Sequence, residues 1–219
     1  ILLERYIMKK YLYLTASFII SSNIAYAADT ITRESIEKAT GVSIGYNTSW
    51  SSHYVWRGES QSSKDMSPAI GVDLGHSSGF YLGAWTGSIT NGTHGAEFDV
   101  YAGYAFDLGP LSFDIGDLYY LYPGESNEVQ FNEYYFSVGT EIPLSMVADD
   151  FSVSPYVYLA YAPKWFGANT PDALYTEAGI EAPIPGTNFS VAYTYGNIDI
   201  DDLEGDGEKG ADVDSWDYY

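Results

Sequence analysis

The stretch from Glu97 to Tyr122 reads EFDVYAGYAFDLGPLSFDIGDLYYLY, and its alternation decides the fold. Apolar side chains alternate with polar or small ones, which is the period of a β-strand. Turn-forming residues at Asp107–Pro110 interrupt the pattern, and the alternation resumes after them. The apolar face ends in Tyr119, Tyr120 and Tyr122, as lipid-facing strands end in aromatic girdles. The stretch therefore predicts an antiparallel hairpin of either a membrane barrel or a soluble sandwich.

The composition limits the chain to one β domain with few kinds of partner. Its 219 residues are enough for one all-β domain, which need not be divided in two. It has no cysteine, so disulfides and thiolate metal sites are excluded. Thirty Asp and Glu residues outnumber nine Lys and Arg, so we expect no nucleic acid as partner.

The N-terminal residues have the pattern of a secretory signal. A basic start at Met8–Lys10, an apolar run at Tyr11–Ile20 and the small-x-small site Ala25–Ala27 predict a signal peptide over 8–27. The alternative, a transmembrane anchor, needs about 20 apolar residues, and this run is shorter. We assign residues 1–7 to upstream non-native sequence, 28–40 to a periplasmic lead-in and 41–219 to the β domain.

The rest of the chain divides into strand-like runs with a period of two. Nine runs are complete, and a tenth begins at the C-terminal end of the sequence. We expect strands over 41–56, 70–74, 80–89, 97–106, 111–122, 131–142, 151–162, 173–182 and 188–197, and the start of another over 212–219.

The segments between these runs favour a barrel over a sandwich. Long segments such as 58–66, 163–172 and 199–211 alternate with short ones such as 77–78 and 183–187. Outer-membrane barrels have this asymmetry, with long loops outside and short periplasmic turns, whereas a sandwich needs irregular crossovers. The predicted fold class is an all-β antiparallel transmembrane barrel of 10–12 strands when complete. We expect this chain to be truncated in strand 10.

Five stretches carry a resemblance to a known family: 54–61, 79–85, 97–104, 112–124 and 133–139. They resemble the TorF-type porin family of small Gram-negative outer-membrane proteins. The most specific of them contains Trp-Arg-Gly-Glu-Ser-Gln at 56–61. The resemblance implies a porin and supplies no catalytic residue. The chain departs from the family at Asp117, which lies on an apolar face, in its acidic 199–214 segment, and in lacking the last strands.

Two groups of residues invite other chemistry. The histidines His53, His76 and His94 could serve a hydrolase, but no serine and carboxylate stand beside them in a recognisable motif. Lumen or loop positions are the alternative for them.

The acidic segment around Asp206 begins with the spacing of a calcium-binding loop. However, Val213 stands where the bidentate glutamate should be, and a solvated acidic loop is the competing interpretation. We therefore expect no enzyme, no metal and no cofactor.

Alternation also assigns charged residues to the inner side of the barrel. Arg57 either pairs with one of these inward acids or lies at the membrane interface on a loop. The pore-lining candidates are His53, Arg57, Glu97, Asp99, Asp114, Glu133, Glu141, Glu177 and Glu181.

These inferences predict a passive, cation-favouring diffusion channel for small hydrophilic solutes or ions. The channel would lie in the cell outer membrane, in contact with its lipid, and assembly into an oligomer is left open. The alternative is a filled barrel with a structural or surface-interaction role. Inward glycines and serines favour the pore, whereas Tyr101, Tyr156 and Tyr158 favour the filled barrel.

Overall fold

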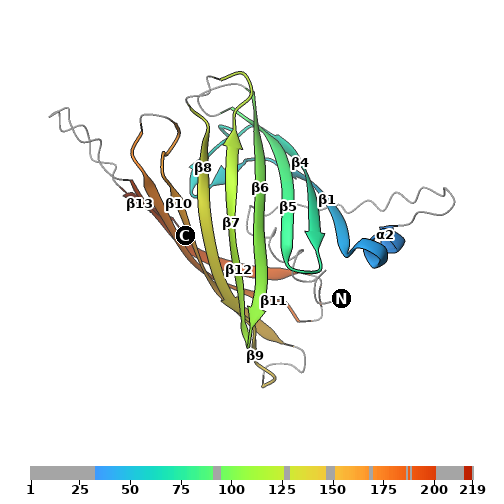
Figure 1. Ribbon diagram of the computed structural model, residues 1–219. Coiled ribbons are helices and arrows are strands. Elements are labelled where there is room, and N and C mark those ends of the chain that lie inside the picture. The colour runs from blue at the N-terminus through green and yellow to red at the C-terminus, as the bar shows by residue number, and fades with distance from the viewer. Residues whose placement is uncertain are drawn as a thin grey trace.

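The computed structural model describes residues 33–90, 95–125, 129–146, 151–167, 170–185, 187, 189–200 and 215–218. The predicted signal peptide, residues 1–7 and the acidic segment around Asp206 lie outside these residues. A short helix, α2 (Arg33–Thr40), precedes one large antiparallel sheet that curls strongly (Figure 1).

Ten strands follow one another in the sheet in the order of the sequence. In spatial order they are β1 (Val42–Ser51), β4 (Ser67–His76), β5 (Phe80–Ile89), β6 (Gly95–Leu108), β7 (Leu111–Leu121), β8 (Phe131–Thr140), β10 (Ser152–Ala162), β11 (Ala173–Pro183), β12 (Ser190–Ile200) and β13 (Ser215–Tyr218). Each of them coincides with one of the ten predicted runs. The all-β antiparallel architecture is therefore confirmed.

The first strand is shorter than predicted. It ends at Ser51 instead of continuing to Trp56, and the next residues form a separate small hairpin of β2 (Val55–Trp56) and β3 (Glu59–Ser60). The segment 58–66, which was expected to be a loop, therefore begins inside this hairpin.

Connection lengths alternate as expected. The turn at 77–79 is short, as is Gly109–Pro110, whereas 52–66 and 163–172 at the opposite end of the sheet are long. The segment after β8 is an exception to this alternation. There, the short strand β9 (Ile142–Pro143) pairs with the start of β10 and lengthens that hairpin.

In a soluble protein the exposed face of a sheet is polar and the buried face is apolar, and in this sheet the arrangement is reversed. Large apolar side chains on one face, here called the apolar face, are exposed; Trp50 and Phe80 are both 63% exposed. Asp117 lies on this face, where Asn132 donates a 3.0 Å hydrogen bond to it. Every strand from β1 to β12 of the main sheet contributes, through Trp50, Val72, Leu82, Phe98, Ile115, Phe136, Leu159, Ile180 and Val191.

The other face, here called the charged face, carries tyrosines that cross the sheet over glycines. Tyr101 pairs in register with Gly83, and an atom added at the glycine Cβ position would lie 2.2 Å from its ring. Because only a residue without a side chain leaves this space, the ring can lie flat against the neighbouring strand. The same arrangement is found for Tyr81 over Gly103, Tyr135 over Gly116 and Tyr156 over Gly179.

The tyrosine cluster that ends β7 is not a girdle on the apolar face. Tyr119 lies there, but Tyr120 and Tyr122 are 3% and 9% exposed and belong to the core of the charged face. Alternation places Tyr120 inward, and Tyr122 lies just beyond the end of the strand. The predicted interfacial role was therefore wrong for these two residues.

In the part of the chain that the structure describes, the sheet is not closed into a barrel. Among the strands that the structure describes, β1 pairs only with β4, and β13 pairs only with β12. None of the helices in the described ranges is long and apolar enough to cross a membrane.

The tyrosine-over-glycine arrangement gives a test of the fold. A Cβ atom at Gly116 would lie 2.3 Å from the Tyr135 hydroxyl oxygen and 2.5 Å from the backbone oxygen of Ala102. Since backbone cannot move aside cheaply, Gly116→Ala should lower the free energy of unfolding by about 1–3 kcal/mol, measured by urea unfolding of refolded protein.

Gly95→Ala is the matched control, because its Cβ would lie 3.9 Å from the nearest heavy atom, the Pro123 carbonyl oxygen. It should leave the unfolding midpoint unchanged or raise it slightly. Equal losses for the two variants would show that the ring does not need the bare backbone at Gly116.

Candidate functional site

The small β2–β3 hairpin places one arginine against the charged face. Arg57 and Gly58 form its two-residue turn and have φ angles of 47° and 80°. Positive φ at both positions defines a type I′ turn, whose twist matches that of paired strands. The Gln61 N–H donates to the Tyr54 carbonyl at 2.8 Å, and the Thr90 N–H donates to the Gln61 carbonyl at 2.8 Å. The first bond closes the base of the hairpin, and the second fixes the hairpin to the residue that follows β5.

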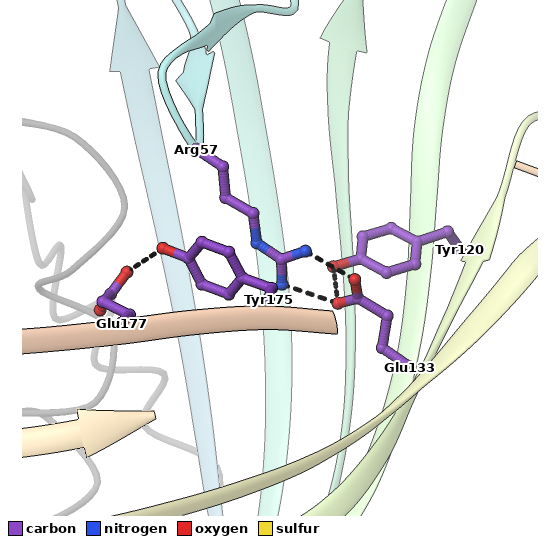
Figure 2. A network of polar contacts seen from close by, with 5 residues as sticks. All are labelled: Arg57, Tyr120, Glu133, Tyr175 and Glu177. Atoms are coloured by element: carbon purple, nitrogen blue, oxygen red, sulfur yellow. Dashed lines mark hydrogen bonds and ion pairs between the residues drawn. The ribbon is translucent and has the colours of Figure 1, made fainter. Parts of the chain in front are cut away.

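Arg57 forms a bidentate ion pair with Glu133 of β8. Its two terminal nitrogens donate to the two carboxylate oxygens at 2.6 and 2.8 Å (Figure 2). Tyr120 of β7 donates a third bond to Glu133 Oε2 at 2.9 Å. Glu133 is 0% exposed and Arg57 is 8% exposed, so water contributes little to their solvation. The fork geometry supplies strong charge-assisted bonds in its place.

Aromatic rings enclose the guanidinium. Its Cζ lies 3.8 Å from the ring centroid of Tyr175 and 4.4 Å from that of Trp56. Trp56 stacks in turn on Trp165, with centroids 5.5 Å apart and planes at 13°. Cations over aromatic faces are attracted by the ring quadrupole, most strongly where water is excluded. The hairpin tip is therefore held by electrostatic and packing contacts together.

The guanidinium of Arg57 stays protonated. Burial by itself would lower the pKa of the guanidinium, but attraction to Glu133 and their hydrogen bonds outweigh it and raise the pKa. Nearby, burial and the charges of Glu97 and Asp99 raise the pKa of Tyr54, which keeps its hydroxyl proton. That hydroxyl donates to Glu97 Oε1 at 3.0 Å.

Further carboxylates on the charged face each accept a hydrogen bond from tyrosine. Tyr81 donates to Asp114 Oδ1 at 2.6 Å, and Tyr101 donates to Asp73. Glu177 accepts from two tyrosines, one on β10 and one on β11; Figure 2 shows Tyr175 joining it to the arginine cluster. The carboxylate charge is thus shared among neutral donors, which stabilises it where basic residues are few.

Asp99 differs from these acids. It is 9% exposed, and its Oδ1 atom is buried without a hydrogen-bond partner in the described part of the chain. It lies on β6 two residues from Glu97, in register with Trp85 on one side and Tyr120 on the other. Within the described ranges, no group of three or more His, Asp or Glu side chains is placed to hold a metal ion.

The structure brings part of the predicted set together. Arg57, Glu97, Asp99 and Glu133 form one group of interacting charges, in which Glu133 is the partner of the arginine. Asp114 and Glu177 lie in the adjoining tyrosine-bonded pairs.

Three of the predicted residues stand apart from this group. His53 shares a 2.8 Å hydrogen bond with Ser60 beside the hairpin. Glu141 is exposed between β8 and β9, where Ser152 donates to it at 2.6 Å. Glu181 lies on β11 and is partly exposed.

Sequence reasoning missed the tyrosines that complete this group. Tyr54 and Tyr120 donate to carboxylates of this group, and Tyr175 donates to the adjoining Glu177. Asp73, which accepts from Tyr101, was not among the candidates. The available signal was parity, because Tyr120 and Tyr175 alternate with apolar-face residues on their own strands. No local pattern indicated Tyr54, which reaches the charged face through the hairpin.

The fold and site define an all-β protein with a curled antiparallel sheet, apolar outside and charged within. The chain belongs to a family described as "Bacterial protein of unknown function (Gcw_chp)", whose model matches residues 35–213. No curated protein matches the chain, and no solved structure does.

The buried ion pair gives a test of the site. Arg57→Met leaves Glu133 as an uncompensated buried charge, so the free energy of unfolding should fall by about 3–5 kcal/mol. The double variant with Glu133→Met should recover most of this loss, because apolar side chains of similar volume often replace a buried pair without cost. Urea unfolding followed by tryptophan fluorescence measures both changes, since Trp56 and Trp165 adjoin the pair.

Lys164→Met is the control, because it removes a positive charge from an exposed position. It should change the free energy of unfolding by less than about 0.5 kcal/mol. A double variant as unstable as Arg57→Met would mean that Arg57 acts through its aromatic packing and not by neutralising Glu133.

Proposed function

We propose that the protein is an outer-membrane β-barrel that works as a passive, cation-favouring diffusion channel for small hydrophilic solutes or ions. The observation that carries this proposal is the inverted sheet, with exposed apolar side chains outside and buried charges inside. In water, an apolar surface of this extent would promote aggregation, whereas in a bilayer it is the surface that contacts lipid.

Closure of the sheet is part of the proposal. Unpaired backbone groups at the edges of β1 and β13 would each cost several kcal/mol in the hydrocarbon region. A spanning sheet must therefore pair its two edges, directly or through further strands, and a complete barrel would have 10–12 strands. The predicted signal peptide and the resemblance to TorF-type porins support the same location.

The inner charges support cation preference. Glu97, Asp99, Asp114 and Glu177 lie on the charged face, while Arg57 is committed to Glu133. Acids that line a narrow path between low-dielectric walls concentrate cations and repel anions.

A filled barrel is the second candidate, and one observation favours it. The β2–β3 hairpin and the rings of Trp56, Trp165, Tyr120 and Phe131 occupy the charged face at one end of the sheet. If these side chains leave no continuous path, the protein has a structural or surface-interaction role.

The channel is tested in planar bilayers. Full-length protein under a KCl gradient should give a reversal potential of cation-selective sign. This potential should shrink in concentrated salt, because the Debye length falls from about 10 Å at 0.1 M to about 3 Å at 1 M. An anion-selective potential would contradict the inner position of the acids.

A hairpin variant separates the two candidates. Replacing residues 54–62 by a short glycine-serine turn removes the side chains that fill one end of the charged face. Conductance in both proteins, larger in the variant, supports a channel narrowed by the hairpin. Conductance in the variant alone supports the filled barrel, and a folded variant without conductance excludes the channel.

A further inference from the structure

One buried acid on the charged face lacks the hydrogen bond that its neighbours have. Asp73, Glu97, Asp114, Glu133 and Glu177 each accept from at least one tyrosine hydroxyl. The Oδ1 atom of Asp99 has no such donor among the described residues, although it is buried. Burying an ionised carboxylate without a partner costs free energy, so a ligand that solvates Asp99 would stabilise the sheet.

The charges around Asp99 favour a positive ligand. Glu97 on the same strand and Glu133 on β8 both interact electrostatically with Asp99. The cation near them is Arg57, and both of its terminal nitrogens donate hydrogen bonds to Glu133. When all three carboxyl groups are ionised, the local group of three carboxylates and one guanidinium has a formal charge of minus two.

The other polar groups that face Asp99 are neutral. Tyr54 of the hairpin segment, Tyr120 of β7 and Tyr122 after β7 all lie within its electrostatic influence. Tyr54 donates to Glu97 and Tyr120 donates to Glu133, so both hydroxyl protons are already committed. The remaining acceptor, Asp99 Oδ1, is buried and accepts no hydrogen bond from the described residues, so a bound cation would supply the solvation that it lacks.

We propose that Asp99 is a binding point for a small hydrated monovalent cation on the inner face of the sheet. This rests on the proposed function and deepens it, because it names the ion class and the residue. A hydrated K⁺ or Na⁺ needs few protein oxygens, whereas Ca²⁺ takes 6–8 oxygen ligands and Mg²⁺ near-ideal octahedral geometry. The described acids do not converge in the way that such divalent sites require.

Cation-dependent stability tests the site without any need for conduction. Full-length protein refolded in detergent is unfolded by urea in KCl and, at the same ionic strength, in N-methylglucamine chloride. The N-methylglucamine cation is too bulky to bind at Asp99. The midpoint should be higher in KCl for wild type and equal in the two salts for Asp99→Asn. Asp117→Asn, an acid on the apolar face, should keep the wild-type difference.

Three outcomes of the unfolding experiment would overturn the site. Equal wild-type midpoints in the two salts would mean that no cation binds, and this result does not depend on any variant folding. Loss of the difference in Asp117→Asn as well would show a general salt effect. A larger rise with CaCl₂ than with KCl, abolished by Asp99→Asn, would mean a divalent site.

Conduction then distinguishes this proposal from the channel itself. In bilayers, Asp99→Asn should reduce the K⁺ over Cl⁻ permeability ratio about twofold or more, because one fixed charge leaves the path. A silent wild-type protein that keeps the KCl-dependent midpoint would retain the site and refute the channel. A cation-selective wild type whose ratio and midpoints are unaffected by Asp99→Asn would retain the channel and refute the site.

Discussion

The burial of Glu133 is the constraint on which the rest of the structure depends. A carboxylate with no exposed surface costs several kcal/mol to desolvate unless a cation and further donors surround it. Nothing on β8 or its neighbours β7 and β10 supplies that cation, so Arg57 comes from a distant segment of the chain. For this reason β1 ends early, the hairpin turns back over the charged face, and the arginine occupies a left-handed turn position.

A second device is the placement of inward tyrosines over glycines of neighbouring strands. Four inward tyrosines, Tyr81, Tyr101, Tyr135 and Tyr156, each lie over a glycine of a neighbouring strand, and this lets the hydroxyl reach a polar group beyond that glycine. Tyr101 crosses Gly83 to Asp73, and Tyr156 crosses Gly179 to Thr194 at 3.1 Å. The rings bury apolar area on a face that otherwise carries acids, and their neutral hydroxyls solvate those acids. Packing and charge solvation are thus combined in one residue type.

The strands could be predicted from the sequence because their determinant is local. A period of two assigns each side chain to a face, and the same parity grouped Glu97, Asp99, Asp114 and Glu133, which are all buried on the charged face. The hairpin could not be predicted in this way, because Arg-Gly is not a residue pair that marks a type I′ turn. Its position follows from contacts to residues more than seventy positions away, which no local pattern records. Tyr120 was misassigned because a run of tyrosines resembles a girdle even when alternate members face inward.

Pairing divides the inner acids into two kinds with different consequences. An acid that accepts hydrogen bonds from tyrosine or arginine stabilises the sheet. Its oxygens are then occupied by protein donors and are less available to other groups. An ionised acid without such a donor destabilises the sheet until something else solvates it. Parity alone treats Glu97 and Asp99 as equivalent neighbours, whereas their hydrogen bonds separate them. The donors around each acid, more than the number of acids on the charged face, therefore determine how the charge of each acid is solvated.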